Sequence, residues 1–247
     1  MSSRVPRLLD RFLLHGTVDA VEDLTPDARL IRVSGQSLRD LAWTPGQHIR
    51  VLVGDLSSPA NWMRGLRDTL RTYSVWDYDA DGRLDLCVLG HPQPGPGARW
   101  AQDVHIGQQV SFTRPEGRLV VQDGAPFHLF VGEETASVAF GAMLRALPAT
   151  ERVYAVLEFA APEDRLPMPR VDELTWVYRN GAAQDEGDAL LRGLRSLDLP
   201  PEPGVAYIAG EARTCQAVRR HLTHDRGWPR KATVVKPFWA PGRTGLD

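Results

Sequence analysis

Short runs in which apolar and polar residues alternate fill the first half of the chain, from His15 to about Gly124. An alternation with a period of two predicts strands with one buried face. Turn residues separate the runs, and Asp81-Gly82 between two of them predicts a tight hairpin. Frequent strands with little helix indicate a barrel or a sandwich. The strands predicted from this pattern are residues 17–21, 30–33, 48–53, 71–76, 84–89, 109–113 and 119–121.

The second half of the chain has a different pattern, in which compact apolar runs alternate with helical spacing. Residues 126–131 form an apolar run typical of a buried parallel strand, and residues 134–147 continue with helical spacing up to Pro148. Strands that alternate with helices predict a parallel α/β sheet, so we expect a β domain at residues 1–124 and an α/β domain at 125–247. The remaining elements predicted here are strands at 153–159, 174–178, 205–209 and 231–237 and helices at 187–197 and 213–224.

The composition is that of an ordinary folded protein. The net charge of −2 over 247 residues gives no reason to expect nucleic acid or an anionic membrane as a partner. Lys231 and Lys236 are the only lysines, so arginine supplies almost all of the positive charge. Cys87 and Cys215 stand alone without zinc-type spacing, and we expect two reduced, buried thiols and no metal site.

The pattern contains no apolar run of the length that a membrane span requires. Charged residues interrupt the apolar positions at 4–14, which therefore predict a short amphipathic helix rather than a signal peptide. The polar stretch 61–70 predicts a mobile insertion. We expect a cytoplasmic protein without membrane insertion.

The run Arg71-Thr72-Tyr73-Ser74, at the start of a predicted strand, is the first candidate site. Alternation places Arg71 and Tyr73 on one face and Thr72 and Ser74 on the other. A guanidinium suits a phosphate, an aromatic ring suits a flat ring system, and a hydroxyl can bond a heteroatom at the ring edge. A flavin combines these features. The alternative is a plain strand start with an exposed arginine and a half-buried tyrosine.

The second candidate site is the proline- and glycine-rich loop that begins at His91. Residues 98–104 have the pattern of a helical turn, and exposed amides at a helix start bind phosphate well, here with Arg99 beside them. A simple connection between two strands is the alternative.

Two further candidates lie where a predicted strand meets a helix, at Gly132-Glu133-Glu134-Thr135-Ala136 and at Gly210-Glu211-Ala212-Arg213. Ligands of open α/β sheets bind at such carboxyl ends of strands. The two glutamates at the first helix start would repel a phosphate, so we expect a nicotinamide or amide contact with Thr135 as donor; simple helix capping is the alternative. Phe238-Trp239 is too aromatic for a free tail, and Trp239 either stacks near a flavin or fills a domain interface.

The order and spacing of these motifs resemble those of the siderophore-interacting protein family. Members of this family are flavin-dependent ferric-siderophore reductases of the ferredoxin-reductase-like superfamily. The resemblance runs from His15 to Gly242. It implies an FAD-binding six-stranded antiparallel β-barrel followed by a Rossmann-like α/β domain that binds NAD(P)H. Besides the four candidate sites, its landmarks are Pro45-Gly46-Gln47-His48, Gly95-Pro96, Trp100-Ala101, Trp176, Arg179 and Gly242.

The resemblance also implies roles for individual residues. Arg71 would hold the FAD pyrophosphate, Tyr73 the isoalloxazine face and Ser74 its reactive edge. No catalytic residue is expected, because the flavin carries the chemistry. The cofactor-binding set is His48, Arg71, Thr72, Tyr73, Ser74, His91, Gly95, Gly97, Ala98, Arg99 and Trp239. The nicotinamide nucleotide set is Glu134, Thr135, Ala136, Gly210, Glu211 and Arg213, and the cations suited to an anionic ferric chelate are Arg64, Arg67, Lys231, Lys236 and Arg243.

Three positions depart from the family pattern. Trp76 stands where the family usually has arginine, and Ala98 stands where it often has serine. The family's closing segment commonly reads Gly-Tyr-Trp-Arg, and here it reads Pro237-Phe238-Trp239-Ala240. The first two weaken the expected phosphate contacts, and the third leaves open whether NADH, NADPH or ferredoxin is the donor. The predicted function is reduction of ferric siderophores through FAD with release of Fe(II). The alternatives are a general NAD(P)H–flavin oxidoreductase with another acceptor and a non-catalytic flavin or siderophore binder.

Overall fold

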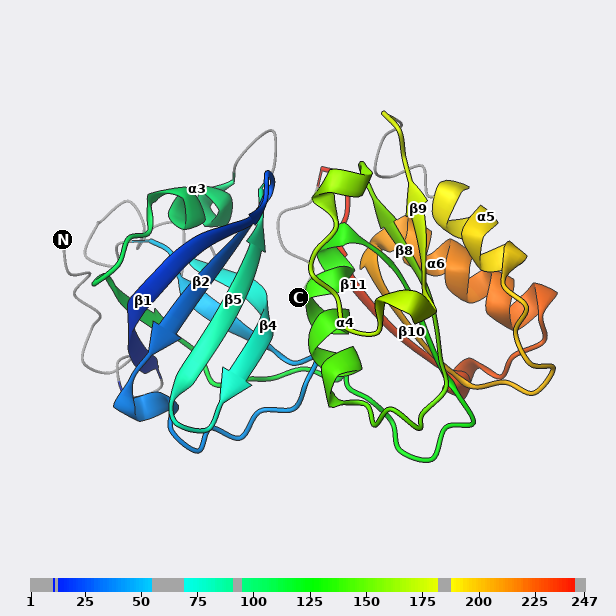
Figure 1. Ribbon diagram of the computed structural model, residues 1–247, viewed down its shortest axis with the longest axis horizontal. Coiled ribbons are helices and arrows are strands. Elements are labelled where there is room, and N and C mark those ends of the chain that lie inside the picture. Colours follow the sequence, from blue (N-terminus) through cyan, green and yellow to red (C-terminus); the bar gives the residue numbers. More distant parts are fainter. Residues whose placement is uncertain (1–10, 12, 55–68, 91–94, 182–187, 243–247) are drawn as a thin grey trace. The chain divides into compact units, whose positions relative to one another are not determined.

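The structure is a computed structural model that describes residues 11, 13–54, 69–90, 95–181 and 188–242 (Figure 1). The chain divides into two compact units, Met1–Arg118 and Leu119–Asp247. Most of the helix predicted at 4–14 and of the insertion predicted at 61–70 lies outside the described residues. Their last residues, Leu14 and Leu70, each begin a strand.

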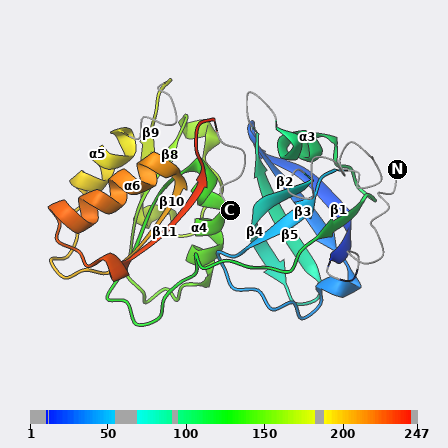
Figure 2. The ribbon, with the colours of Figure 1, turned by 180° about the vertical axis from the view of Figure 1, so that it is seen from behind.

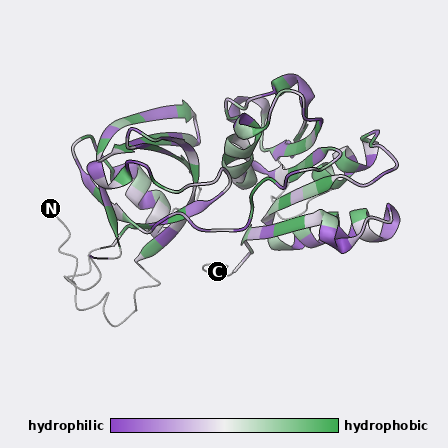
Figure 3. Ribbon diagram, turned by 90° about the horizontal axis from the view of Figure 1, so that it is seen from below, coloured by the Kyte–Doolittle hydropathy of each residue, from purple (hydrophilic) through white to green (hydrophobic). Residues whose placement is uncertain are grey.

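Unit 1 is a closed barrel in the order β1-β2-β5-β4-β3-β6, and every adjacent pair is antiparallel (Figures 1 and 2). This confirms the predicted six-stranded barrel. Apolar and polar residues alternate along its strands (Figure 3), and side chains such as Ile31, Ile49, Leu86 and Phe112 fill the interior without exposure to solvent. The strands are β1 Leu14–Thr25, β2 Ala28–Ser34, β3 His48–Leu52, β4 Leu70–Asp79, β5 Arg83–Leu89 and β6 Gln109–Phe112, and the helix α3 spans Pro96–Asp103.

The strand predicted at 119–121 is wrong. The barrel is already closed by the pairing of β1 with β6, so it offers no edge on which another strand could pair. The backbone amide of Gln122 instead donates to the Tyr207 hydroxyl at 2.8 Å, and Leu119 is buried as a single apolar residue. The segment therefore connects the two units rather than extending a sheet.

Unit 2 is a five-stranded parallel sheet in the order β11-β10-β7-β8-β9, as expected for a Rossmann-like domain. Every residue of the central strand β7 is buried, because α4 covers one face of the sheet and α5 and α6 cover the other (Figure 1). The strands are β7 His128–Glu133, β8 Val153–Phe159, β9 Leu174–Tyr178, β10 Val205–Glu211 and β11 Thr233–Trp239, and the helices are α4 Glu134–Ala146, α5 Asp188–Ser196 and α6 Ala212–Arg220.

Local chemistry accounts for the ends of several elements. α4 stops before Pro148, whose ring disfavours a helical residue before it. The last strand begins at Thr233 rather than at residue 231, because Arg230–Ala232 form a 3-10 turn closed by the Thr233 hydroxyl on the Arg230 carbonyl, 2.8 Å away. Cys87 and Cys215 are both free and buried, as expected.

Candidate functional site

The start of α3 lies against the motif on β4. A Cβ built on Gly97 would come within 2.5 Å of the Tyr73 hydroxyl and 3.2 Å of Cγ of Arg71. Arg71 and Tyr73 therefore share the face of β4 that meets α3, as the alternation predicts. The neighbouring residue Ser74 lies on the opposite face of β4, directly across from His48 on β3. The fold thus joins the first two candidate sites around Gly97, which must be glycine for this approach.

The amino end of α3 is open. Its N-cap is Gly95, no side chain among the described residues caps it, and Pro96 occupies the first turn. The unpaired amides of a helix start attract an anion, and the Arg71 side chain lies beside them. Arg99 is exposed on the same helix, Ala98 lies in the first turn, and His91 lies outside the described residues.

Tyr73 supplies the test of whether a dinucleotide fits here. Its ring packs on Trp100 with 5.7 Å between ring centroids. Its hydroxyl is buried and has no hydrogen-bond partner in the part of the chain that the structure describes. Burial raises the pKa of this hydroxyl, so it stays protonated and remains a donor at neutral pH. A phosphate or ribityl oxygen at the start of α3 would accept that bond, so the residues present fit FAD.

His48 and Thr72 lie on the other side of the same strand pair. His48 exchanges backbone hydrogen bonds with Glu116, and its ring lies 3.7 Å from the Glu116 carboxylate. Arg50, which pairs with Thr72 across the strands, donates to the same carboxylate at 3.0 Å. Thr72 itself is exposed. His48, Thr72 and Ser74 therefore form a second, polar face of the motif, turned away from α3.

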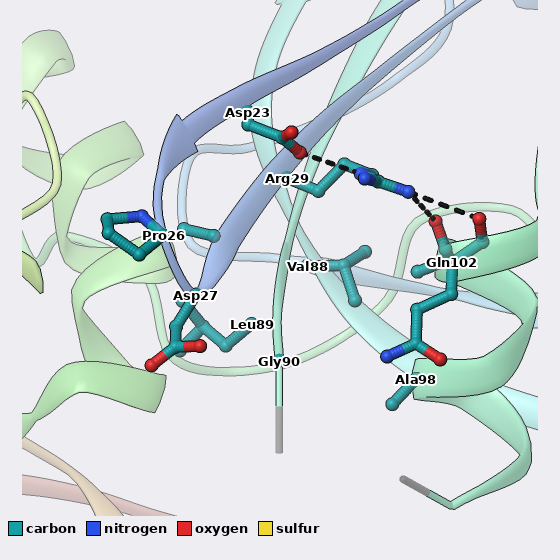
Figure 4. A pocket seen from close by; sticks show the side chains of 11 residues that line it. Asp23, Pro26, Asp27, Arg29, Val88, Leu89, Gly90, Ala98 and Gln102 are labelled. Carbon is teal, nitrogen blue, oxygen red and sulfur yellow. Dashed lines mark hydrogen bonds and ion pairs between the residues drawn. The ribbon is translucent and has the colours of Figure 1, made fainter. Parts of the chain in front are cut away.

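A cavity of about 240 Å³ lies beside α3, between the β1–β2 hairpin and the end of β5 (Figure 4). Arg29 spans its side: the guanidinium pairs with Asp23 at 2.9 Å and donates to the carbonyls of Ala101 and Gln102, each at 3.2 Å. These carbonyls belong to the last turn of α3, where a cation is favourable. Arg29 therefore ties the helix to the barrel. Sequence analysis missed this contact because the two carbonyls lie more than 70 positions from Arg29.

We expect Arg29→Ala to lower the free energy of unfolding of unit 1 by about 1 kcal/mol, because the last carbonyls of α3 lose their donor. Urea unfolding followed by tryptophan fluorescence measures this change. The matched control is Asp23→Ala, which removes an exposed ion-pair partner and leaves the carbonyl bonds in place, so its effect should be smaller. Equal losses in the two variants would contradict this role of the carbonyl bonds.

The carboxyl edge of the sheet in unit 2 carries three buried glutamates, Glu133, Glu158 and Glu211, each the last or next-to-last residue of its strand. Each accepts a hydrogen bond from the amino end of a different helix. The amides of Thr135 in α4, Leu190 in α5 and Thr214 in α6 donate at 2.8, 3.0 and 2.7 Å. The three helix starts are therefore capped by the protein's own carboxyl groups, which accept the amide bonds that a phosphate would otherwise accept.

Glu133 brings together two of the motifs predicted for unit 2 and the closing aromatic residue. It accepts from the Thr135 hydroxyl and, at 3.1 Å, from the indole nitrogen of Trp239. Gly210 lets this carboxylate approach, because a Cβ there would lie 2.5 Å from Oε1 of Glu133. Ala136 packs against Gly132 at the start of α4. Trp239 is thus bound to unit 2, and its contact with a flavin stays a prediction.

Arg179, which the sequence supplied only as a landmark, is held at the same edge. It donates to both carboxylate oxygens of Glu134 at 3.0 and 3.1 Å and lies 3.6 Å from the carboxylate of Glu158. Only 9% of its side chain is exposed. Burial raises the pKa of Glu158, and the charge of Arg179 opposes that rise. The charge of Arg179 is therefore already paired with two carboxylates of the protein, those of Glu134 and Glu158.

The other predicted residues lie farther apart. Arg213 is exposed in the first turn of α6. Lys236 lies within β11, level with Ala209, whereas Lys231 lies in the turn before that strand, toward the amino edge of the sheet. Arg64, Arg67 and Arg243 lie outside the described residues. The two lysines therefore do not form one cationic cluster at the carboxyl edge.

The buried carboxyl of Glu133 makes stability depend on pH. Burial raises its pKa above the ordinary value of 4.5, although bonds from Thr135 and Trp239 oppose the rise. Above about pH 4.5 the unfolded chain releases this proton while the folded chain keeps it. We therefore expect the free energy of unfolding to fall as pH rises from 4.5 toward the folded-state pKa, and to level off above it.

Urea unfolding at a series of pH values checks this expectation. Glu133→Gln should reduce the fall of the free energy of unfolding with pH, and the part of the fall due to Glu158 should remain. Glu163→Gln, a change at an exposed residue, should leave the pH dependence unchanged. An identical pH profile in wild type and Glu133→Gln would show that Glu133 does not hold the proton.

Among the described residues, no group of three or more histidine, cysteine or acidic side chains is arranged to hold a metal ion. None of the described helices has the length and apolar character needed to cross a membrane.

Comparisons with known proteins agree with this geometry. Sequence models of the siderophore-interacting FAD-binding domain and of the siderophore-interacting protein match residues 17–119 and 125–242. An uncharacterized protein from Mycobacterium tuberculosis is 30% identical over 201 residues, which are 76% of this chain and 71% of that one. The ferric vibriobactin reductase ViuB from Vibrio cholerae is 26% identical over 178 residues, 70% of this chain and 65% of its own. The crystal structure of a siderophore utilization protein from T. fusca matches with a TM-score of 0.79, at 26% identity and over 95% of both chains.

Proposed function

The chain belongs to the siderophore-interacting protein family, and on that premise we propose that it is an FAD-dependent reductase that passes electrons from NAD(P)H to the iron of ferric siderophores. The observation that carries the proposal is the start of α3, which no described side chain caps. The Arg71 side chain and the Tyr73 hydroxyl, which has no hydrogen-bond partner among the described residues, lie beside it. A ferric vibriobactin reductase among the relatives supports the choice of acceptor.

In this proposal unit 1 binds the cofactor through residues with separate tasks. The amides of Gly97 and Ala98 and the Arg71 guanidinium hold the pyrophosphate, and Tyr73 donates its hydroxyl hydrogen to an oxygen of the cofactor. Ser74 and His48, on the other face of β4 and β3, meet the edge of the flavin ring and orient it. Bound FAD supplies the redox chemistry, since it takes up two electrons and releases them singly.

Unit 2 has the task of binding the nicotinamide nucleotide. Glu134, Thr135 and Ala136 on α4 and Gly210 and Glu211 on β10 lie at the carboxyl edge of adjacent strands, where α/β sheets bind such ligands. One carboxylate oxygen of Glu211 is buried without a hydrogen-bond partner among the described residues, which supplies an acceptor for a carboxamide. No side chain needs to act as an acid or base on iron, and reduction to Fe(II) releases the metal because Fe(II) binds hard oxygen ligands less tightly.

Absorbance spectra of the purified protein test the proposal. We expect a flavin spectrum that NADPH or NADH bleaches in the absence of air, and whose oxidised form returns when a ferric siderophore is added, with Fe(II) trapped by a chelating dye. Bleaching without reoxidation by any ferric chelate would favour a general flavin oxidoreductase. A flavin spectrum that neither nucleotide nor reduced ferredoxin bleaches would favour a non-catalytic binder, and failure to bind FAD would overturn both.

A further inference from the structure

The carboxyl edge of unit 2 offers a nucleotide few places for its phosphates. The starts of α4, α5 and α6 are closed by Glu133, Glu158 and Glu211, and Arg179 is neutralised by Glu134 and Glu158. A phosphate at this edge must therefore be met by an exposed cationic side chain that the protein has not already paired.

Arg165 is such a side chain, and two aromatic rings hold it in place. Its guanidinium carbon lies 4.9 Å from the centre of the Trp176 ring and 5.1 Å from that of Tyr178. Trp176 and Tyr178 lie two residues apart on β9 and so face the same side of the sheet, where Trp176 also packs on the buried Phe159. Arg165 is exposed, and its guanidinium has no hydrogen bond or ion pair within the described part of the chain.

The place of this stack in the sheet indicates which part of a nucleotide it would meet. The predicted nicotinamide residues lie at the start of α4, which follows β7, at the end of β10 and in the first turn of α6. The edge strand β9 lies two strands from β7, and so about 10 Å away. Arg165 follows the turn Pro162–Asp164 at the carboxyl end of β8. A dinucleotide with its nicotinamide at β7 and β10 would therefore extend its adenosine end toward β9.

We propose that Arg165, held on Trp176 and Tyr178, binds the 2′-phosphate of NADPH and makes this chain select NADPH over NADH; this inference rests on the proposed function. Stacking fixes the plane of the guanidinium and leaves its N–H groups free at the rim, where they can form paired bonds to a phosphate. An arginine near the ribose is a usual way for an α/β domain to accept this extra phosphate. NADH lacks the group and gains nothing from the contact.

The test measures binding of 2′,5′-ADP and 5′-ADP by calorimetry, together with kcat/KM for NADPH and NADH. Wild type should prefer 2′,5′-ADP and NADPH by at least about tenfold, since a hydrogen bond to a charged group is worth about 1.5 kcal/mol or more. Arg165→Ala and the longer Arg165→Gln should both abolish the preference while leaving NADH kinetics unchanged. Arg165→Lys should restore part of it, because the charge returns without the planar fork.

Arg220→Ala is the matched control, because Arg220 is an exposed arginine at the carboxyl end of α6, away from the carboxyl edge of the sheet. This variant should keep the preference for 2′,5′-ADP and NADPH. Equal binding of the two ADP forms by wild type, or a preference that survives in Arg165→Ala, would overturn the inference even if NADH still drives ferric reduction. Selective binding of 2′,5′-ADP that depends on Arg165 in a protein unable to reduce ferric siderophores would support the inference and overturn the proposed function alone.

Discussion

Replacing Arg71 by leucine is expected to weaken the binding of FAD about 100-fold, because a paired guanidinium–phosphate contact contributes about 3 kcal/mol. The side chain lies against Gly97 at the start of α3, where no side chain in the described part of the chain caps the helix. Loss of its charge removes the guanidinium that is proposed to pair with the pyrophosphate beside the amides of α3. Titration of the flavin-free protein with FAD, followed by quenching of flavin fluorescence, measures the change.

Riboflavin separates loss of the phosphate contact from general damage, because it lacks both phosphates and its affinity should change little in Arg71→Leu. Arg83→Leu is the matched protein control, since Arg83 is an exposed arginine on β5 paired only with Asp79 among the described residues. Arg71 also donates to the Leu70 carbonyl at 2.8 Å, so thermal unfolding of each variant must be recorded. An FAD affinity within about threefold of wild type would place the pyrophosphate elsewhere.

Replacing Gly210 by alanine is expected to lower the free energy of unfolding of unit 2 by about 3 kcal/mol, from backbone strain and a steric clash together. Gly210 has φ of +123°, a conformation that alanine rarely adopts, and the new Cβ would lie 2.5 Å from the Glu133 carboxylate. The displaced carboxylate would loosen its bonds to Thr135 and Trp239 as well. Urea unfolding followed by far-UV circular dichroism measures the loss.

Gly227→Ala is the control for the backbone strain, because Gly227 has φ of +72° and a Cβ there would meet no atom of the described residues within 4 Å. Its cost should be about 1 kcal/mol, so the difference between the two variants reports the clash with Glu133. Equal costs at the two glycines would mean that the carboxylate moves aside freely and that the cap of α4 is not tightly held.

The fold could be predicted from the sequence because its signals are local. Alternation along β1 to β6 predicted the barrel strands, and apolar runs followed by helical spacing predicted the parallel sheet. The strand predicted at 119–121 failed because a short apolar run does not reveal whether a sheet edge is free to receive it, and the closed barrel has none. The 3-10 turn at Arg230–Ala232 similarly shortened the last strand. The hydrogen bond from the Thr233 hydroxyl that closes this turn cannot be predicted from the spacing of apolar residues.

In the candidate sites too, the sequence predicted the features that depend on near neighbours and missed the contacts between remote residues. Alternation alone placed Arg71 and Tyr73 on one face, and two acidic residues in sequence indicated that the start of α4 repels phosphate. The contacts of Arg29 with the end of α3 join residues 72 and 73 positions apart, and no local sequence pattern around Arg29 predicts them. The same holds for Trp239 and Glu133, which lie 106 positions apart.

The sequence by itself determined the two architectures, their order, and the short motifs that end strands and begin helices, because periodicity and turn chemistry act between near neighbours. Only the tertiary structure decided which helix starts are open and which are closed, which arginines are already paired, and that Arg165 rests on Trp176 and Tyr178. Those properties depend on strand order and on distances between side chains from remote segments, and such distances exist only once the sheets have formed.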